Sequence, residues 1–234
     1  LMNKIIILHG WSYSIDKYEE FNSLLKEKGL KTSILKVPGL TQQLDRDEVW
    51  NIDNYVQWLK RILDKEGKVI LIGHSNGGRI SLNFAAKYPE KVEKLILIDS
   101  AGIYHNNLYL KLKRSFFAAL AKIGKKITKS ELLRNILYKL TGESDYKNAS
   151  LNMKQTMINL LNSDKFLKLE NIQTPTLIIW GGKDKITPLS DGLLINKLIK
   201  NSKLEIIKDA RHSPQFTHPQ EVVKLIQQFS NITI

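Results

Sequence analysis

The chain of 234 residues contains no cysteine. This absence excludes disulfide bonds, thiolate metal sites and a cysteine nucleophile. The absence of cysteine does not indicate whether the protein works in an oxidising or a reducing compartment, and the cytoplasm is the simplest expectation. The first residues, LMNKIIILHG, hold too short an apolar run for a signal peptide, and no apolar run in the sequence reaches the roughly 20 residues that span a bilayer.

Common cofactor and metal motifs are also missing from the sequence. GGKDK at 181–185 has glycines and a lysine but lacks the spacing of a phosphate-binding loop, and no dinucleotide-binding fingerprint occurs. The histidines and acidic residues form no cluster with the spacing of metal ligands. We therefore expect no cofactor and no metal ion.

The positive charge is concentrated in one block. Residues 103–168 contain 13 Lys/Arg and 4 Asp/Glu, which accounts for +9 of the net charge of +13. A basic block attracts anionic lipid, anionic substrates or nucleic acid, whereas a chain rich in lysine throughout shows the same excess without any such partner. Nucleic acid is not expected, because aromatic residues are not interleaved on the charged face.

Six short apolar runs without polar alternation are typical of strands buried on both faces of a parallel sheet. These runs are 4–8, 32–37, 68–72, 94–98, 176–180 and 204–208. Helical patterns lie between them, including 16–28 and 52–65, and Pro188 and Pro219 can each open a helix. The sequence therefore predicts an α/β fold, with a mostly or entirely parallel sheet of about six strands flanked by helices.

A long segment before the fifth predicted strand interrupts this alternation. It shows amphipathic helical patterns at 108–127, at 131–140 and around Met153, Met157 and Leu160. A connection of this length favours a helical cap over the edge of the sheet. We predict a cap, or lid, of residues 102–168 on a core domain formed by 1–101 and 169–234.

Polar motifs follow five of the six predicted strands. They are HGWS (9–12), GHSNGG (73–78), DSAG (99–102), GGKD (181–184) and DARHS (209–213). Because the carboxyl ends of parallel strands share one edge, these motifs are expected to converge there, where ligands bind in such sheets.

Ser75 lies in a G-x-S-x-G turn between a buried strand and a helical pattern. Gly73 and Gly77 supply the small residues that such a sharp turn needs, and the turn lifts the hydroxyl clear of the backbone. The helix beginning at Asn76 directs free N–H groups towards a developing oxyanion. This context favours a catalytic nucleophile over a glycine turn with an incidental serine.

A serine nucleophile needs a general base, and the chain has five histidines. His212 follows the last strand and can direct its imidazole back over the edge of the sheet. His9 and His74 lie beside glycines and are expected to pack locally. His105 opens the insertion, where we expect a mobile segment, and His218 precedes a proline and is expected to cap or to face solvent.

The base in turn needs an acid that orients it. Asp184 follows the fifth strand after two glycines and is the first choice. Asp99, one strand nearer the serine, is the alternative, since an acid there can also reach the histidine. Asp209 is interpreted as a turn residue.

The motifs HGW, GHSNGG, GGKD and RHSPQFTHPQEVVKLIQQF resemble those of the α/β-hydrolase superfamily, in the group of small capped serine esterases and hydrolases. The resemblance covers nearly all of the chain outside the insertion. It implies Ser75 as nucleophile, Asp184 as acid and His212 as base, with an oxyanion hole formed by the backbone N–H groups of Trp11 and Asn76.

The sequence departs from the family pattern in three places. The HG strand is the first of the chain, whereas family members often have two strands before it. Arg211 stands where a glycine usually precedes the catalytic histidine, and Thr217 stands where an acid is common. None of these departures removes a catalytic group.

The expected reaction is cofactor-free hydrolysis of carboxylic esters with small or medium acyl chains. A lysophospholipase or acyl-thioesterase, or a carbon–carbon bond hydrolase with the same triad, is the alternative within the enzyme class. A ligand receptor on the same fold is the alternative outside it. The expected partners are a small-molecule ester and, through the basic cap, peripheral anionic lipid.

Overall fold

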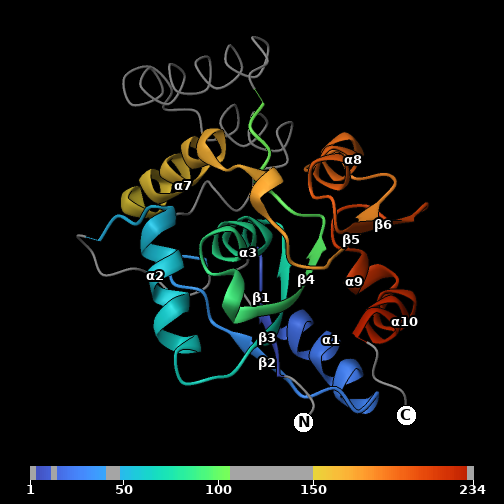
Figure 1. The fold of residues 1–234 in the computed structure, drawn as a ribbon. Helices are drawn as coiled ribbons and strands as arrows, with labels where there is room; N and C mark the ends of the chain where they lie inside the picture. The colour runs from blue at the N-terminus through green and yellow to red at the C-terminus, as the bar shows by residue number, and fades with distance from the viewer. Residues whose placement is uncertain (1–3, 12–14, 41–47, 106–149, 231–234) are drawn as a thin grey trace.

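A computed structural model describes residues 4–11, 15–40, 48–105 and 150–230 (Figure 1). Six strands form one sheet in the order β2-β1-β3-β4-β5-β6, and every pairing is parallel. The strands are β1 (Ile5–Leu8), β2 (Thr32–Leu35), β3 (Val69–His74), β4 (Val92–Ile98), β5 (Thr176–Gly181) and β6 (Ser202–Ile207). The predicted fold class and all six predicted strands are confirmed, with ends that differ by one to two residues.

Helices and short 3-10 turns connect the strands. The helices are α1 (Asp16–Glu27), α2 (Ile52–Leu63), α3 (Asn76–Lys87), α7 (Leu151–Ser163), α8 (Leu189–Leu198), α9 (Pro214–Thr217) and α10 (Pro219–Ser230). The 3-10 turns are η1 (Pro89–Lys91), η2 (Asp164–Phe166) and η3 (Leu169–Asn171). The predictions at 16–28 and 52–65 correspond to α1 and α2, and helices begin at or directly after Pro219 and Pro188.

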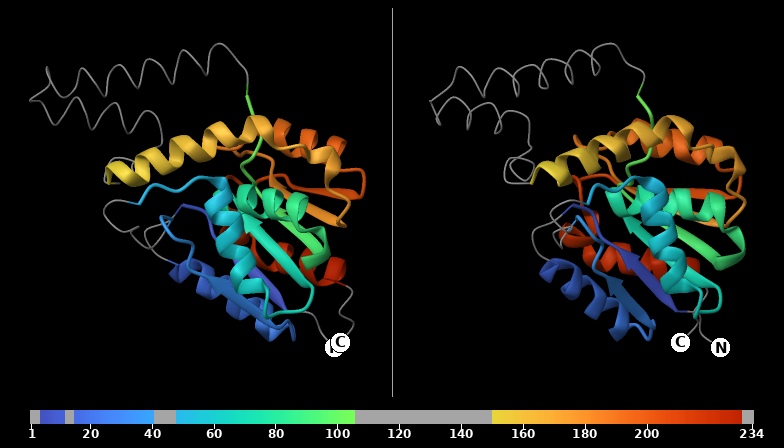
Figure 2. Two further views of the ribbon diagram at one scale, coloured as in Figure 1. Left: turned by 60° about the vertical axis from the view of Figure 1, so that its left-hand side comes forward. Right: turned by 90° about the vertical axis from the view of Figure 1, so that its left-hand side faces the viewer.

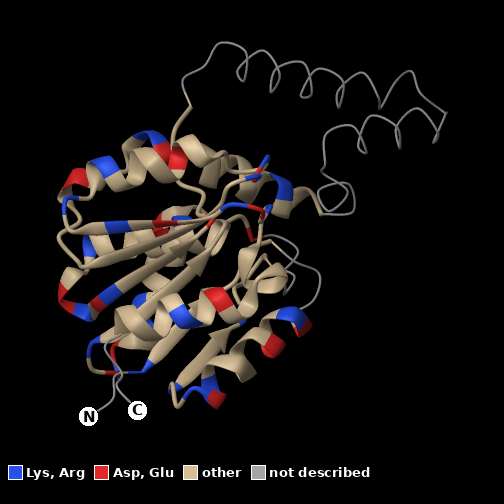
Figure 3. Ribbon diagram, turned by 90° about the vertical axis from the view of Figure 1, so that its right-hand side faces the viewer, with Lys and Arg blue, Asp and Glu red and all other residues tan. Residues whose placement is uncertain are grey.

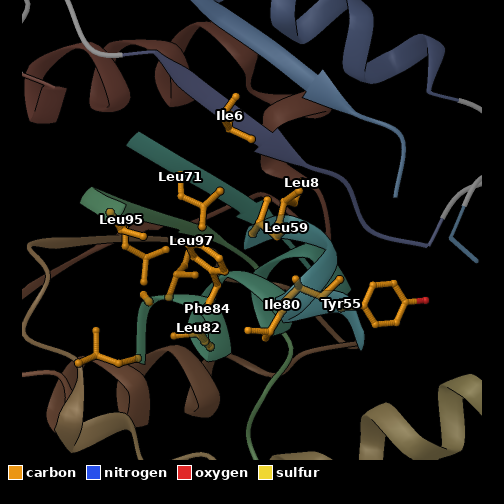
Figure 4. Close-up of a cluster of buried hydrophobic side chains, with 14 of the residues drawn as sticks. Ile6, Leu8, Tyr55, Leu59, Leu71, Ile80, Leu82, Phe84, Leu95 and Leu97 are labelled. Carbon is orange, nitrogen blue, oxygen red and sulfur yellow. The ribbon is translucent and has the colours of Figure 1, made fainter. Parts of the chain in front are cut away.

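Two apolar layers explain why the strands lack alternation. Ile6 and Leu8 of β1 point into a cluster with α2, α3 and α8, whereas Ile5 and Ile7 point to the opposite face, into a cluster with α1 and α10. Figure 4 shows the first cluster, in which side chains of β1, β3 and β4 meet those of α2 and α3. Each fully buried Ile or Leu contributes about 1.5–3 kcal/mol, so both faces of these strands must be apolar.

The order of the strands creates a topological switch point between β1 and β3. The chain adds β2 on one side of β1 and then returns to add β3 on the other side. The connections that leave β1 and β3 therefore diverge, and the space between them at the carboxyl ends is where open parallel sheets bind ligands. The HGW segment and Ser75 leave the sheet at these two ends.

Helix α7 is the α-helix of the predicted cap that the structure describes. It corresponds to the third helical pattern of the insertion, and Figure 2 shows it lying along the carboxyl edge of the sheet above α2 and α3. The other two predicted helices, 108–127 and 131–140, lie outside the described residues, as does most of the basic block. Over the described helices, positively and negatively charged residues are mixed along the ribbon (Figure 3).

Candidate active site

Ser75 sits on a sharp turn between β3 and α3. Its backbone has φ 52° and ψ −119°, in a region that L residues rarely adopt. Its N–H donates to the carbonyl of Ile98 over 3.1 Å, and its carbonyl accepts the N–H of Ala101 over 3.0 Å. These bonds hold the strained turn against the end of β4.

The glycines around Ser75 are required by close backbone contacts. A Cβ on Gly77 would overlap the carbonyl of Leu8 in β1, and a Cβ on Gly73 would lie 2.6 Å from the Cα of Gly78. Either overlap would force strand or helix to shift. The steric reason predicted for the two glycines therefore holds in the structure.

His212 and Asp184 come together at the same edge. The Nδ1 of His212 lies 2.8 Å from Oδ2 of Asp184, whose side chain is fully buried. Asp184 also accepts the Oγ1–H of Thr187 over 2.7 Å and the N–H of Ile186 over 2.7 Å. Burial alone would raise the pKa of Asp184, but the hydrogen bond and charge of His212 and the other donors hold it below its usual value. Asp184 is thus a carboxylate that fixes the histidine ring.

Asp99, the alternative acid, has different partners. Its Oδ1 accepts the N–H of Gly181 and its Oδ2 accepts the N–H of Ser213, each over 2.8 Å. Its backbone also has a positive φ of 41°. Burial raises the pKa of Asp99 to about 7, and the charge of Asp184 adds to this, although the two N–H donors and His212 oppose it.

His74 lies in a buried network that sequence reasoning described only as local packing. Tyr18 Oη accepts the N–H of Gly10 over 2.9 Å, so its own proton is donated to Nδ1 of His74 over 2.6 Å. Nε2 of His74 therefore carries the ring proton and donates it to Oγ of Ser213 over 3.2 Å. Burial, followed by the charges of His212 and His9, holds the pKa of His74 well below its usual value, so the ring is neutral.

The segment after β1 passes close to Ser75. A Cβ on Gly10 would lie 3.0 Å from the Cβ of Ser75. Nε2 of His9 accepts the N–H of Val37 over 2.9 Å, so Nδ1 carries the proton and donates it to the Gly10 carbonyl over 2.7 Å. His9 is therefore a neutral side chain that fixes the segment leading to Trp11. The prediction of local packing therefore holds for His9 only at Gly10, since His9 also binds Val37, and His74 is bonded to residues distant in the chain.

A buried ion pair joins α3 to the segment after α7. Arg79 donates from Nε and from an Nη to the two oxygens of Asp164, over 2.7 and 2.9 Å. Its remaining Nη donates to the side-chain oxygen of Asn76. Both ionic side chains are almost completely buried. Sequence reasoning missed this pair, because 85 residues separate its members.

His105, which was expected to lie in a mobile segment, has a hydrogen-bonded partner in the structure. Its Nε2 is 2.9 Å from Oδ2 of Asp191, a buried side chain in the first turn of α8. Asp209, interpreted as a turn residue, is exposed and pairs with Lys183 over 2.6 Å.

One group of side chains within the described residues resembles a metal-ligand set. Ligand atoms of His74, Asp99 and His212 lie within 4.8 Å of one another. Both oxygens of Asp99 and both ring nitrogens of His74 already take part in hydrogen bonds, as does Nδ1 of His212. A metal ion would have to break several of them, so we interpret the group as a hydrogen-bonded network.

Among the described helices, none is long and apolar enough to cross a membrane.

Comparisons with known proteins find several similar hydrolases. The chain is 28% identical over 248 residues to the pimeloyl-[acyl-carrier protein] methyl ester esterase of Wigglesworthia glossinidia brevipalpis, covering 96% of this chain and 92% of that protein. It is 27% identical over 251 residues to the 2-hydroxy-6-oxononadienedioate/2-hydroxy-6-oxononatrienedioate hydrolase of Escherichia coli K12, covering 96% and 86%. It spans 44% of the biotin biosynthesis bifunctional protein BioHC of Teredinibacter turnerae, with 24% identity over 253 residues and 96% of this chain covered.

The fold is also shared with solved structures. A lipase described as putative, from Acinetobacter baumannii AYE, superposes with a TM-score of 0.74 at 24% identity, covering 97% of this chain and 83% of that one. The family model for serine aminopeptidase S33 matches residues 2–218. The chain therefore belongs to the serine aminopeptidase S33 family, within the α/β-hydrolase superfamily.

Proposed function

We propose that the protein is a serine hydrolase that cleaves carboxylic esters of small or medium acyl chains. The observation that carries the proposal is the His212–Asp184 pair, which lies at the same strand edge as the strained turn of Ser75. A nucleophile on a strained turn and a histidine oriented by a buried carboxylate are the parts that acyl transfer requires. The esterase relative from Wigglesworthia supports ester cleavage.

In the proposed mechanism, the Ser75 hydroxyl attacks the ester carbonyl carbon while His212 takes its proton. The oxyanion is held by the backbone N–H groups of Trp11 and Asn76, each worth about 3 kcal/mol of barrier reduction. The histidine then protonates the leaving alkoxide, and an acyl-enzyme forms. Water, activated by the same imidazole, releases the acid and restores the serine. Asp184 stays ionised throughout and stabilises the imidazolium.

The orientation of His212 supports its role as the base. Because Nδ1 faces the Asp184 carboxylate, the ring proton is held at Nδ1 and Nε2 is the nitrogen left with a lone pair. That nitrogen is the one that accepts a proton from a serine hydroxyl in a Ser-His-Asp arrangement. Tautomer and carboxylate thus agree with general-base catalysis.

Hydrolysis of p-nitrophenyl acetate, butyrate and longer esters tests the proposal, with thioesters assayed in parallel. We expect the Ser75→Ala variant to lose at least about 10³-fold in kcat while keeping the wild-type melting temperature. Wild-type turnover no faster than that of Ser75→Ala would refute ester hydrolysis. Preference for thioesters or lysophospholipids would identify the alternative leaving groups.

Carbon–carbon bond hydrolysis is the second candidate, because the E. coli relative is named as a hydrolase of 2-hydroxy-6-oxononadienedioate. That compound has no ester bond, so its hydrolysis cleaves a carbon–carbon bond. The same triad could serve both reactions, so triad variants do not separate them. The two reactions are separated by comparing kcat/KM for 2-hydroxy-6-oxononadienedioate with kcat/KM for p-nitrophenyl butyrate. A ratio above one would favour carbon–carbon cleavage over ester cleavage.

A further inference from the structure

Asp99 is a buried acid that the proposed mechanism does not use. Its side chain is completely shielded from solvent at the carboxyl end of β4, between the ends of β3 and β5. A buried carboxylate is costly unless several donors compensate it. The donors that Asp99 has are two backbone N–H groups, and each comes from a different loop of the proposed site.

The first donor belongs to the loop of the proposed acid. The N–H of Gly181, three residues before Asp184, donates to Oδ1 of Asp99 over 2.8 Å. The backbone of Asp99 reaches the same loop, because its carbonyl lies 3.1 Å from Oγ1 of Thr187, which also contacts the Asp184 carboxylate. Asp99 therefore contacts the acid loop on both sides of Asp184.

The second donor belongs to the loop of the proposed base. Ser213, directly after His212, donates its N–H to Oδ2 of Asp99 over 2.8 Å. Ser213 has a left-handed φ of 88°, which a non-glycine residue adopts only where its surroundings enforce it. Its hydroxyl is held by His74 on another side. Asp99 and His74 thus keep Ser213 in the strained conformation that sets the direction of the preceding residue.

We propose that Asp99 is a positioning residue, whose carboxylate holds the loops of Asp184 and His212 in register by accepting one backbone N–H from each. This inference rests on the proposed function of the site. The two loops are already packed closely, since a Cβ on Gly181 would overlap the Arg211 carbonyl, and Lys183 N–H donates to the Ala210 carbonyl over 2.8 Å. Asp99 adds the contact that sets the fine alignment of the two catalytic side chains.

The charge of Asp99 is required for this role. A carboxylate accepts at both oxygens, whereas a protonated carboxyl turns an O–H towards one of the two N–H donors and loses that bond. The groups that face Asp99 are the Asp184 carboxylate, which opposes its ionisation, and His212 and neutral His74, which lie within the same cluster. Protonation of Asp99 should therefore reduce activity in the acidic range.

The test compares Asp99→Asn with Asp209→Asn in steady-state kinetics across pH. An asparagine accepts at one oxygen and presents an NH₂ to the other donor, so we expect a loss of about 10- to 100-fold in kcat, with KM changed by less than about 3-fold. Asp209→Asn is the matched control, since Asp209 is exposed three residues before His212, and its kcat should stay within about 2-fold of wild type.

The pH profile provides a readout that a purely structural role would not move. Protonation of Asp99 and its replacement by asparagine weaken the same contact, so the ratio of wild-type to Asp99→Asn kcat/KM should fall as the pH decreases. The ratio of wild-type to Asp209→Asn kcat/KM should stay constant. A ratio to Asp99→Asn that does not change with pH, or a kcat for Asp99→Asn equal to that of Asp209→Asn, would overturn the proposal. If Asp99→Asn does not fold, hydrogen exchange of wild type decides the matter: protection of the Gly181 and Ser213 amides should fall as the pH decreases, and constant protection would overturn the proposal.

Amide hydrogen exchange separates failure of this inference from failure of the proposed function. The Gly181 and Ser213 amides should exchange at least about 10-fold faster in Asp99→Asn than in Asp209→Asn, whether or not any ester is cleaved. Equal exchange in the two variants refutes the positioning role. Unequal exchange in a protein without Ser75-dependent turnover refutes the hydrolase and leaves the Asp99 contacts standing.

Discussion

Removal of the Asp164 carboxylate should destabilise the protein more than removal of any exposed acid. Arg79 and Asp164 have side chains that are only 4% and 3% exposed, and two hydrogen bonds join them. In Asp164→Ala the guanidinium stays buried and keeps only the side chain of Asn76 as a neutral acceptor. Leaving one member of a buried pair uncompensated costs about 3–5 kcal/mol.

The matched control is Asp53→Ala, which removes an acid from a second ion pair of the same helix. Lys87 of α3 and Asp53 pair over 3.0 Å, but their side chains are 46% and 71% exposed. Such a pair contributes about 0–1 kcal/mol. The two variants therefore delete the same chemical group opposite the same helix and differ mainly in burial.

Urea denaturation and thermal melting measure the difference. For a chain of this size, 1 kcal/mol corresponds to about 2–4 °C, so we expect Asp164→Ala to melt about 6–20 °C below wild type and Asp53→Ala within about 4 °C of it. Replacing Arg79 by methionine in the Asp164→Ala background should recover part of the loss, because the unpaired charge is removed. Equal losses in the two single variants, or a double variant less stable than Asp164→Ala, would refute the reasoning.

Three further predictions concern the edge of the sheet. Asp184→Asn should reduce kcat by about 10⁴-fold, far more than Asp99→Asn, and the opposite ranking in ester assays would transfer the role of acid to Asp99. Burial raises the pKa of Asp99 in the folded chain to about 7, whereas its ordinary pKa, expected in the unfolded chain, is 3.8. At pH 5 the folded chain therefore binds a proton at Asp99 that the unfolded chain releases. The contribution of Asp99 to the free energy of unfolding should therefore increase by about 2–3 kcal/mol from pH 8 to pH 5. Urea titrations at the two pH values measure this increase, and it should be absent in Asp99→Asn. Tyr18→Phe removes the acceptor of the Gly10 N–H and the donor to His74. It should lower the free energy of unfolding, measured in the same urea titrations, by about 1–3 kcal/mol. A loss below about 0.5 kcal/mol would contradict the network.

The strands and the turn at Ser75 were predictable because their physical requirements are local. A strand buried on both faces must be apolar at every position, and such runs stand out in the sequence. The turn needs small residues where β1 and α3 pass close by, and glycine is the residue without a Cβ. The polar motifs after the strands converge at one edge because all strands are parallel. This convergence made His212 and Asp184 candidates, although both lie more than 100 residues beyond Ser75.

The contacts that hold this edge together were not predictable in the same way. Tyr18 occupies an apolar position of α1, and nothing in the sequence distinguishes it from an ordinary core aromatic residue until its hydroxyl is seen between Gly10 and His74. Arg79 follows Ser75 by one helical turn, and from the sequence it is expected to be an exposed basic residue, although its partner Asp164 lies at the far end of the predicted cap. Such pairings depend on tertiary distances between residues that have no periodic relation in the chain.

The choice between the two buried acids shows what the structure adds to the proposal. Both follow strands, both are buried, and both lie near His212, so their positions along the chain do not separate them. Their donors do. Asp184 faces the imidazole and has a lowered pKa, and Asp99 faces two backbone amides and has a raised one. Stabilising an imidazolium needs a partner that stays ionised as the proton arrives, which favours Asp184 as the acid. Asp99, with its carboxylate taken up by the two loops, is better suited to holding that partner in place.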